Sequence, residues 1–203
     1  MKSPPVSNIS VCQKPPEESV PSQGGSRSTI DPMPLNDTDR RYLDLAIEQA
    51  QLGWDEGGVP IGAALVHHGA DGDRVLAVGR NRRVQDGSVI RHGETDCLER
   101  AGRLPASVYR ECTLYTTLSP CTMCAGTAIL YDIPRIVIGE NQSFEASEEW
   151  LRSKGTELVV AADPTCLALM QQMMDERPEV WAEDIGVETD ELGTPAAGIE
   201  PRA

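Results

Sequence analysis

Two short motifs contain the residues whose types and spacing could do chemistry. One is His92-Gly93-Glu94, and the other places Cys121 and Cys124 three positions apart after a serine-proline pair. Three positions is close to one helical turn, so both thiols project on one side and can hold a single ion. Two thiolates and an imidazole form a soft tetrahedral set that suits zinc, and three protein ligands leave the fourth position for water. The motifs therefore predict one catalytic Zn²⁺ ion per chain, bound by His92, Cys121 and Cys124.

Glu94 is the candidate proton carrier of this site. On a regular helix, a residue two positions from His92 would point about 200° away from it. We therefore expect His92 to lie just before a helix, with Gly93 allowing a close backbone approach, so that both side chains reach one pocket. Glu94 would take a proton from the water and deliver it to a leaving group. A His-x-Glu motif followed by Pro-Cys-x-x-Cys is the signature of zinc deaminases.

Two other interpretations of the cysteines stay open at this stage. A structural zinc site needs a fourth protein ligand, but His67 and His68 are neighbours on a predicted strand and face opposite ways. A redox pair is the second alternative, although it requires no upstream histidine. The remaining cysteines, outside the N-terminal extension that holds Cys12, are expected to be small core residues.

Alternating strands and helices must position these motifs. A helix is expected from Asp37 or Thr38 to Gly53, and Asp163 with the following proline should start another helix. Residues 61–68 and 75–79 have the pattern of a hairpin. Further strands are expected at 113–117, 135–139 and 157–161, and helices at 93–103, at 121–131, in a short segment around 150–151 and near the C-terminus. A hairpin followed by strand and helix units predicts an α/β fold with a mixed sheet and helices on both faces.

The composition suits one domain with an extension at each end. Of the 203 residues, 1–34 are rich in proline and serine and are expected to be disordered, 35–186 form the domain, and 187–203 form a disordered acidic tail. The net charge of −14 lies mostly in the domain and disfavours nucleic acid as a partner. No apolar run is long enough to cross a membrane, and no signal peptide is visible. We expect a cytoplasmic protein, with the nucleus left open, that acts on a small molecule.

Residues from about 43 to 187 resemble the fungal-type cytosine deaminases of the cytidine deaminase superfamily. The segments that carry the resemblance are EGGVPIG (56–62), GRN (79–81), HGE with CLERAGRL (92–104), TLYTTLSPCTMC (113–124), IPRIVIGEN (133–141) and DERPEVWAEDIG (175–186). The resemblance implies a three-layer α/β/α cytidine-deaminase-like fold with a central mixed five-stranded sheet. It also implies zinc-dependent hydrolysis of free cytosine, a small-molecule nucleobase, to uracil and ammonia in pyrimidine salvage, by a homodimer that joins through helix faces.

The resemblance also assigns roles to single residues. Glu94 would be the catalytic proton shuttle, with zinc on His92, Cys121 and Cys124. The residues expected to bind the base are Asn81, Asp184 and the backbone of Gly93 and Cys121 at its edge, with Ile61, Phe144 and Trp181 as walls. Without the resemblance, the two aromatic residues would be assigned to the core, Asp184 to a solvated surface and Asn81 to a turn.

The substrate and one local cluster of charge remain open. The same chemistry would serve cytidine, guanine or another amino-heterocycle, or an adenosine in tRNA, and a zinc-stabilised interaction module is the non-enzymatic alternative. Four arginines, Arg80, Arg82, Arg83 and Arg91, surround Asn81 and His92 in the sequence. They could attract a phosphate or form a solvated rim, diluted by Asp86.

Overall fold

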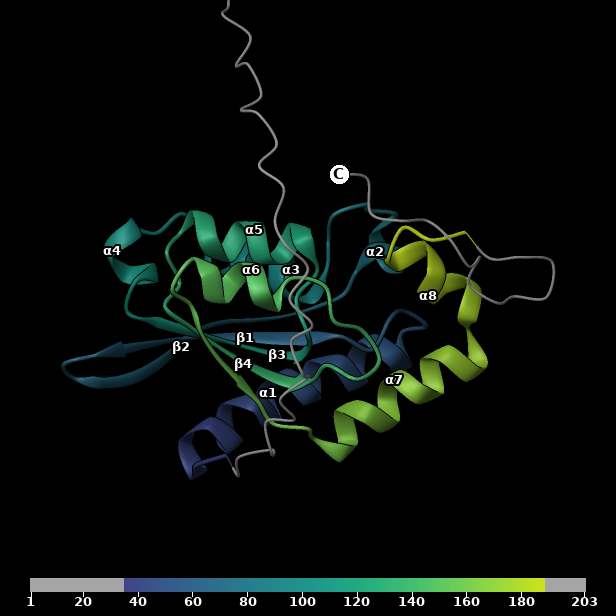
Figure 1. Cartoon of the computed structure of the whole chain (residues 1–203), viewed down its shortest axis with the longest axis horizontal. Helices are drawn as coiled ribbons and strands as arrows, with labels where there is room; N and C mark the ends of the chain where they lie inside the picture. The colour runs from purple at the N-terminus through teal and green to yellow at the C-terminus, as the bar shows by residue number, and fades with distance from the viewer. Residues whose placement is uncertain (1–34, 189–203) are drawn as a thin grey trace, which may run out of the picture. The chain divides into compact units, whose positions relative to one another are not determined.

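A five-stranded sheet forms the centre of the domain in the computed structural model, which describes residues 35–188 (Figure 1). The predicted extension 1–34 lies outside the described residues, as do residues 189–203 of the predicted tail 187–203. The strands are β1 (Gly62–Gly69), β2 (Gly72–Arg80), β3 (Cys112–Leu118), β4 (Arg135–Glu140) and β5 (Glu157–Val160). Their order is β2-β1-β3-β4-β5. β1 runs antiparallel to β2 and β3, while β3, β4 and β5 are parallel, which confirms the predicted mixed sheet.

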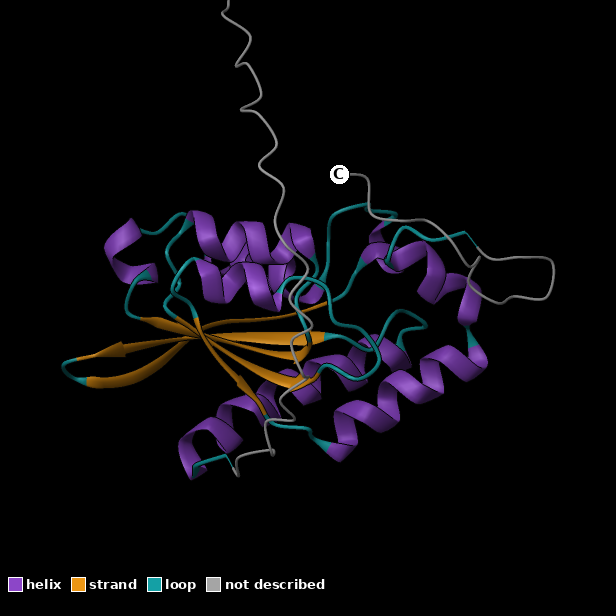
Figure 2. Ribbon diagram, in the orientation of Figure 1, coloured by secondary structure: helices purple, strands orange, loops and turns teal. Residues whose placement is uncertain are grey.

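Helices cover both faces of the sheet and produce three layers (Figure 2). They are α1 (Asp37–Asp55), α2 (Arg83–Asp86), α3 (Gly93–Ala101), α4 (Ala106–Tyr109), α5 (Thr122–Leu130), α6 (Glu148–Ser153), α7 (Pro164–Glu176) and α8 (Pro178–Asp184). Helices α3, α5 and α6 lie over one face, while α1 and α7 lie over the other. No helix within residues 35–188 is long and apolar enough to span a membrane.

Both faces of the central strands β1, β3 and β4 are buried along most of their length, so apolar residues occur on both faces. Leu65, Leu114 and Ile136 pack under α3, α5 and α6. Their strand neighbours Val66 and Tyr115 point the opposite way, into the core under α1. A third apolar cluster, around Met170 of α7, lies at the end of the sheet where the zinc motifs are found.

The observed helix ends differ from the expected ones at α1 and agree at α7. Asn36, rather than Asp37 or Thr38, caps α1, and its side-chain oxygen accepts a 2.8 Å hydrogen bond from the Asp39 amide. The helix continues past Gly53 to Asp55. Asp163 caps α7 as predicted, accepting hydrogen bonds from the amides of the next turn at 2.9 and 3.0 Å. The single-turn helices α2 and α4 were not expected, since four residues are too few to show a helical period.

Candidate active site

The starts of α3 and α5 bring the three predicted metal ligands together. His92 is the N-cap of α3, as its spacing from Glu94 predicted, and Cys121 is the N-cap of α5. One donor atom each from His92, Cys121 and Cys124 all lie within 4.8 Å of one another, and His92 Nδ1 is 3.5 Å from Cys121 Sγ. An imidazole and two sulfurs match the donor preference of zinc. The residues therefore fit one zinc ion.

The ionisation of the two thiols also fits a cation at this position. A hydrogen bond from Cys124, together with His92, lowers the pKa of Cys121 to about 4. The same hydrogen bond and burial raise the pKa of Cys124 well above its usual range. Burial disfavours the charged imidazolium of His92, but Cys121 and Asp184 outweigh it and raise the His92 pKa. A second thiolate beside the first thus needs a neighbouring positive charge, which a metal ion would supply.

Glu94 lies beside this cluster in the first turn of α3, where it is buried. Its Oε1 accepts a 3.1 Å hydrogen bond from the hydroxyl of Thr116, and its Oε2 lies 3.4 Å from the Cys124 thiol. Burial, with the nearby charge of Cys121, raises the pKa of Glu94 above that of an exposed glutamate. A carboxyl with a raised pKa can both accept and return a proton near neutral pH.

Gly93 permits the close contact that places the start of α3. A Cβ at this position would lie 2.9 Å from the carbonyl oxygen of Ile61, which is shorter than real side chains show. The glycine therefore lets the helix begin directly against the backbone that precedes β1. It also lets His92 and Glu94 face the same cavity, which both residues line.

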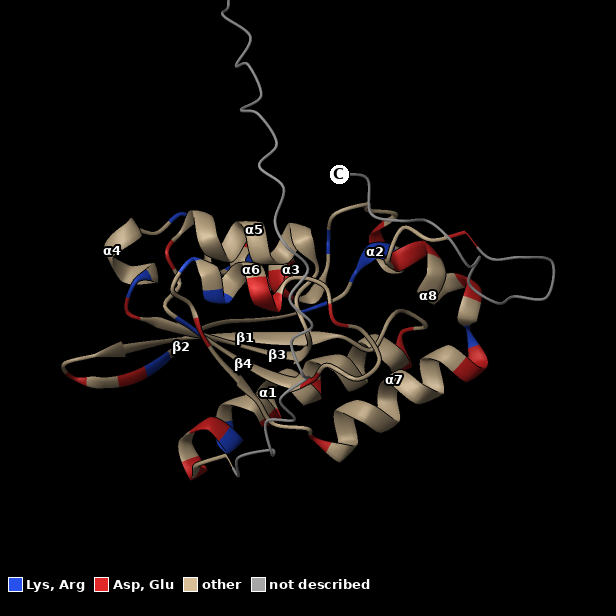
Figure 3. Cartoon of the chain, viewed as in Figure 1, with Lys and Arg blue, Asp and Glu red and all other residues tan. Residues whose placement is uncertain are grey.

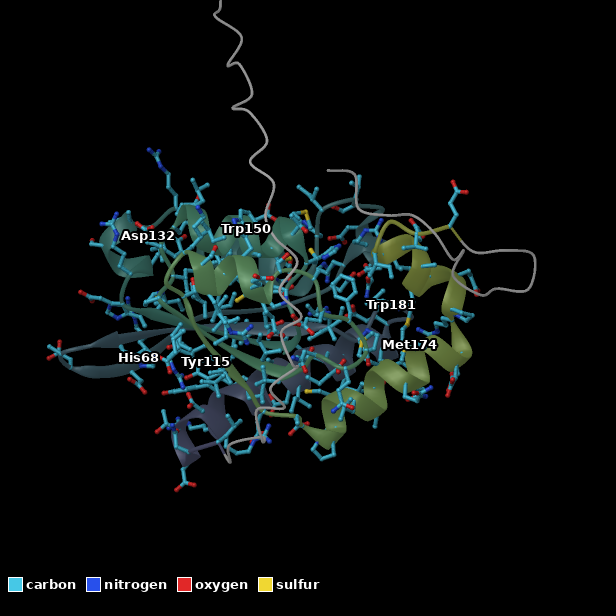
Figure 4. The ribbon with its side chains drawn as sticks, viewed as in Figure 1. His68, Tyr115, Asp132, Trp150, Met174 and Trp181 are labelled. Carbon is cyan, nitrogen blue, oxygen red and sulfur yellow. The ribbon has the colours of Figure 1, made fainter. Side chains whose placement is uncertain are left out.

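A partly open cavity lies next to the metal ligands. Seven of the predicted site residues line it: Ile61, His92, Glu94, Cys121, Phe144, Trp181 and Asp184. The remaining three, Asn81, Gly93 and Cys124, are not among the residues that line it. Trp181, labelled in Figure 4, meets Phe144 edge to face, with ring centroids 5.9 Å apart and an interplanar angle of 87°. Two aromatic rings therefore enclose one side of the cavity.

Asp184 is a buried charge that connects α8 to the rest of the site. Its Oδ1 accepts a 2.7 Å hydrogen bond from the amide nitrogen of Asn81 and lies 3.3 Å from the Arg83 guanidinium. Its Oδ2 is 3.9 Å from His92 Nε2. The amide oxygen of Asn81 accepts from the backbone of Arg83 at 3.0 Å. Asn81 thus contacts Asp184 in this structure and holds it in place.

The four arginines near Asn81 are paired with carboxylates. Arg80 pairs with Glu56, Arg83 with Asp184, Arg82 with Asp86, and Arg91 with both Asp86 and Glu99. Figure 3 shows basic and acidic positions side by side at α2 and α8. Hydrogen bonds from Arg82 and Arg91 lower the pKa of Asp86 to about 2, so the carboxylate stays charged. This neutralised cluster has little charge left for a phosphate.

Sequence reasoning missed four residues of the site. Leu118, Ser119 and Ile185 line the cavity, and Thr116 bonds Glu94 from behind it. Three of them lie in the TTLSPC segment that leads from β3 into the Cys-x-x-Cys motif. Their position immediately before a metal ligand was the signal that could have found them. Ile185 carried no such signal, because only the fold brings the end of α8 to the cavity.

Comparison with known proteins agrees with this geometry. Residues 36–140 match the family model described as the cytidine and deoxycytidylate deaminase zinc-binding region. The chain is 45% identical over 148 residues to a cytosine deaminase of Candida albicans. This match covers 73% of this chain and 97% of the relative. It is 38% identical over 108 residues to a probable cytosine deaminase of Schizosaccharomyces pombe, covering 52% of this chain and 62% of the relative. A solved structure from a study of A-to-I editing by tRNA:A34 deaminases matches with a TM-score of 0.54 and 27% identity, covering 64% of this chain and 99% of that one.

Proposed function

The chain belongs to the family of zinc-binding cytidine and deoxycytidylate deaminases, and from this premise we propose that it hydrolyses free cytosine to uracil and ammonia. The observation that carries the proposal is a buried carboxyl, Glu94, beside a His/Cys/Cys cluster at a small cavity walled by aromatic rings. The 45% identity to a cytosine deaminase favours cytosine as the base. A purely structural zinc module is disfavoured, since it would have no use for a buried proton carrier.

Zinc held by His92, Cys121 and Cys124 would supply Lewis-acid chemistry that brings the pKa of a water from about 15.7 towards about 7. Glu94 takes a proton from the attacking water and delivers it to ring N3 of cytosine, while the water oxygen bonds to C4. Glu94 then carries the second proton of that water to the exocyclic amino group. The C4–N bond breaks, ammonia leaves, and uracil remains.

The side of the cavity formed by Asp184, Phe144 and Trp181 holds the base during these proton transfers. The carboxylate of Asp184 accepts a hydrogen bond from an N–H of the ring, and the rings of Phe144 and Trp181 contact its faces. Asn81 keeps Asp184 in position through their 2.7 Å hydrogen bond. A direct contact between Asn81 and the base stays a prediction, as does the contact with the backbone of Gly93 and Cys121. Holding the ring in a fixed position beside Glu94 makes the proton transfers effectively unimolecular, which lowers their entropic cost.

Ammonia release from cytosine, cytidine and an adenosine-containing tRNA, with and without a chelator, tests this function. We expect release from cytosine alone, lost with the chelator and restored by zinc. Preference for cytidine or tRNA would contradict the proposed substrate, and activity that survives complete zinc removal would contradict the proposed chemistry. A tRNA substrate would also show a steep salt dependence, which a neutral base would not.

We further propose that the protein is a homodimer joined through the outer faces of α5 and α6. Helix α5 carries no charged residue, yet its last residue, Leu130, is 73% exposed. Tyr131 and Trp150 of the same layer are 37% and 40% exposed. An apolar helix at a surface is typical of a covered face. Light scattering should give the mass of a dimer for the wild type. The Leu130→Asp variant should have the mass of a monomer, and the control Val89→Asp, in an exposed loop, should stay a dimer.

We also propose a cytoplasmic location and a place in pyrimidine salvage. The thiols of Cys121 and Cys124 must be reduced to bind a metal, and the cytoplasm keeps thiols reduced. Fractionation of cells and growth on cytosine as the pyrimidine source test these two points. Recovery of the active protein in a secreted fraction would contradict the location.

A further inference from the structure

Thr116 is a buried polar residue whose neighbours on the same face of its strand are apolar. It lies on β3 between Leu114 and Leu118 on the same face of the strand, and all three residues are buried. β3 is the middle strand, and Thr116 is paired with Ala63 of β1 and Ile138 of β4. Burying a hydroxyl at such a place is unfavourable unless it forms a hydrogen bond. A threonine here therefore points to a specific partner.

The partner of the Thr116 hydroxyl is the carboxylate of Glu94. Thr116 Oγ1 lies 3.1 Å from Glu94 Oε1 and 3.2 Å from the carbonyl oxygen of Leu118. A hydroxyl has one proton to donate. When Glu94 is ionised, as it must be to take a proton from water, its carboxylate is a stronger acceptor than the Leu118 carbonyl. The Thr116 proton is thus directed to Glu94, from a backbone position held by strand pairing on both sides.

The second side-chain contact of Glu94 cannot hold it when the site binds a metal. That contact is the Cys124 thiol, 3.4 Å from Oε2. Cysteine binds metals as a thiolate, which has no proton to donate. Among the residues that the structure describes, Thr116 then remains the side-chain donor to this carboxylate.

We propose that Thr116 is a positioning residue that holds the Glu94 carboxylate by Oε1 and leaves Oε2 for proton transfer. The inference rests on the proposed deamination and adds a residue to it. Losing the hydroxyl would free the carboxylate to rotate without removing a zinc ligand or a wall of the cavity. A misplacement of about 1 Å can lower a catalysed rate about 100-fold.

Two matched pairs of chains isolate the hydroxyl. The wild type and Thr116→Val differ by a hydroxyl in place of a methyl group, and Thr116→Ser and Thr116→Ala differ by a hydroxyl alone. We expect kcat for cytosine to be about 10- to 100-fold lower in Thr116→Val than in the wild type, and lower by a similar factor in Thr116→Ala than in Thr116→Ser. KM should stay within about threefold, and zinc should stay at one ion per chain, because no ligand or cavity wall changes.

Thr113→Val is the control on the same strand. Thr113 is also buried, but its hydroxyl pairs with His68 Nε2 at 2.9 Å, away from the site. We expect this variant to keep the wild-type kcat. A crystal structure of zinc-loaded Thr116→Val should show the Glu94 carboxylate turned from its wild-type orientation, which gives a readout independent of activity.

The outcomes separate this inference from the proposed function. A wild type that releases no ammonia from cytosine contradicts the function itself. An active wild type together with equal kcat values for Thr116→Ser and Thr116→Ala overturns the role of Thr116. The serine and alanine pair decides the question even where the valine variant fails to fold. Loss of zinc from Thr116→Ala but not from Thr116→Ser would also overturn it, in favour of a role in metal binding.

Discussion

The metal side and the base side of the cavity are built in different ways. The metal side takes His92 and Glu94 from the start of α3, and Cys121 and Cys124 from the start of α5. Each pair belongs to one short segment, so local helix geometry nearly determines how its members face one another. Tertiary packing then has to bring the two helix starts together, which places His92 Nδ1 3.5 Å from Cys121 Sγ.

The base side is assembled from segments that lie far apart in the sequence. Asp184 of α8 meets Asn81, 103 positions away, and Trp181 of the same helix meets Phe144 in the loop after β4. The seven-residue helix α8 is held at its beginning by Arg177, whose guanidinium lies 3.9 Å from the Trp54 ring centroid. Position here comes from side-chain contacts rather than from one element. We expect changes on the metal side to affect the chemistry and changes on the base side to affect binding.

Removing a zinc ligand should have the largest effect. Cys124→Ala leaves a site with two ligands, and we expect zinc to fall from one ion per chain to near zero and deamination to fall to background. Metal analysis and ammonia release measure both quantities. Cys112→Ala is the control, because this buried thiol donates to the Val108 carbonyl at 3.1 Å, outside the site. Full zinc and activity in Cys124→Ala would contradict the assigned ligand set.

Replacing Glu94 by glutamine should stop proton transfer while zinc stays bound. General acid–base catalysis contributes about 10²- to 10⁴-fold, and we expect kcat to fall by that amount. Metal analysis should still give one zinc per chain, since Glu94 is not a ligand. Deamination near the wild-type rate with zinc in place would remove Glu94 from the mechanism.

Asp184→Asn tests the base side at its charged residue. Hydrogen bonds to charged groups contribute about 1.5–3 kcal/mol, so we expect kcat/KM for cytosine to fall about 10- to 150-fold, mostly through KM. Zinc should stay bound, which would confirm that the two sides are separable. Glu183→Gln is the matched control, since its carboxylate is 71% exposed and lies 3.6 Å from Arg83. Loss of zinc from Asp184→Asn would show that the two sides are coupled.

The difference between the two sides also explains what could be predicted from the sequence. The ligand set and the place of His92 before α3 follow from the spacing of the motifs, because the number of positions between two residues at a helix start determines whether their side chains point the same way. The strands follow from apolar runs that the sheet buries on both faces. No such rule connects Asn81 with Asp184, and only the family resemblance brought the two together.

Where neighbouring residues are chemically equivalent, tertiary contacts decide between them. Asn36, Asp37 and Thr38 can all cap a helix, and the sequence could not rank them. Asn36 also donates to Asp39 Oδ2 at 2.8 Å, and Asp39 is itself held by Arg135 of β4 at 2.7 and 2.8 Å. Thr116 was missed for a related reason, because a hydroxyl inside an apolar strand shows its partner only once α3 is in place.

Phe144→Leu should have the smallest effect and tests whether the base side also acts as an aromatic enclosure. The variant keeps an apolar side chain but loses the edge-to-face contact with Trp181. In the proposed function Phe144 also contacts the base, and an aromatic contact of this kind contributes about 0.5–1.5 kcal/mol beyond the buried area, so we expect kcat/KM for cytosine to fall about 2- to 12-fold. Zinc content and kcat should hold, and the ratio of cytosine to cytidine turnover measures whether the wall has opened to larger substrates. A fall in kcat alone, with KM unchanged, would mean that this wall orients the ring for proton transfer, and the division between a chemical side and a binding side would fail at Phe144.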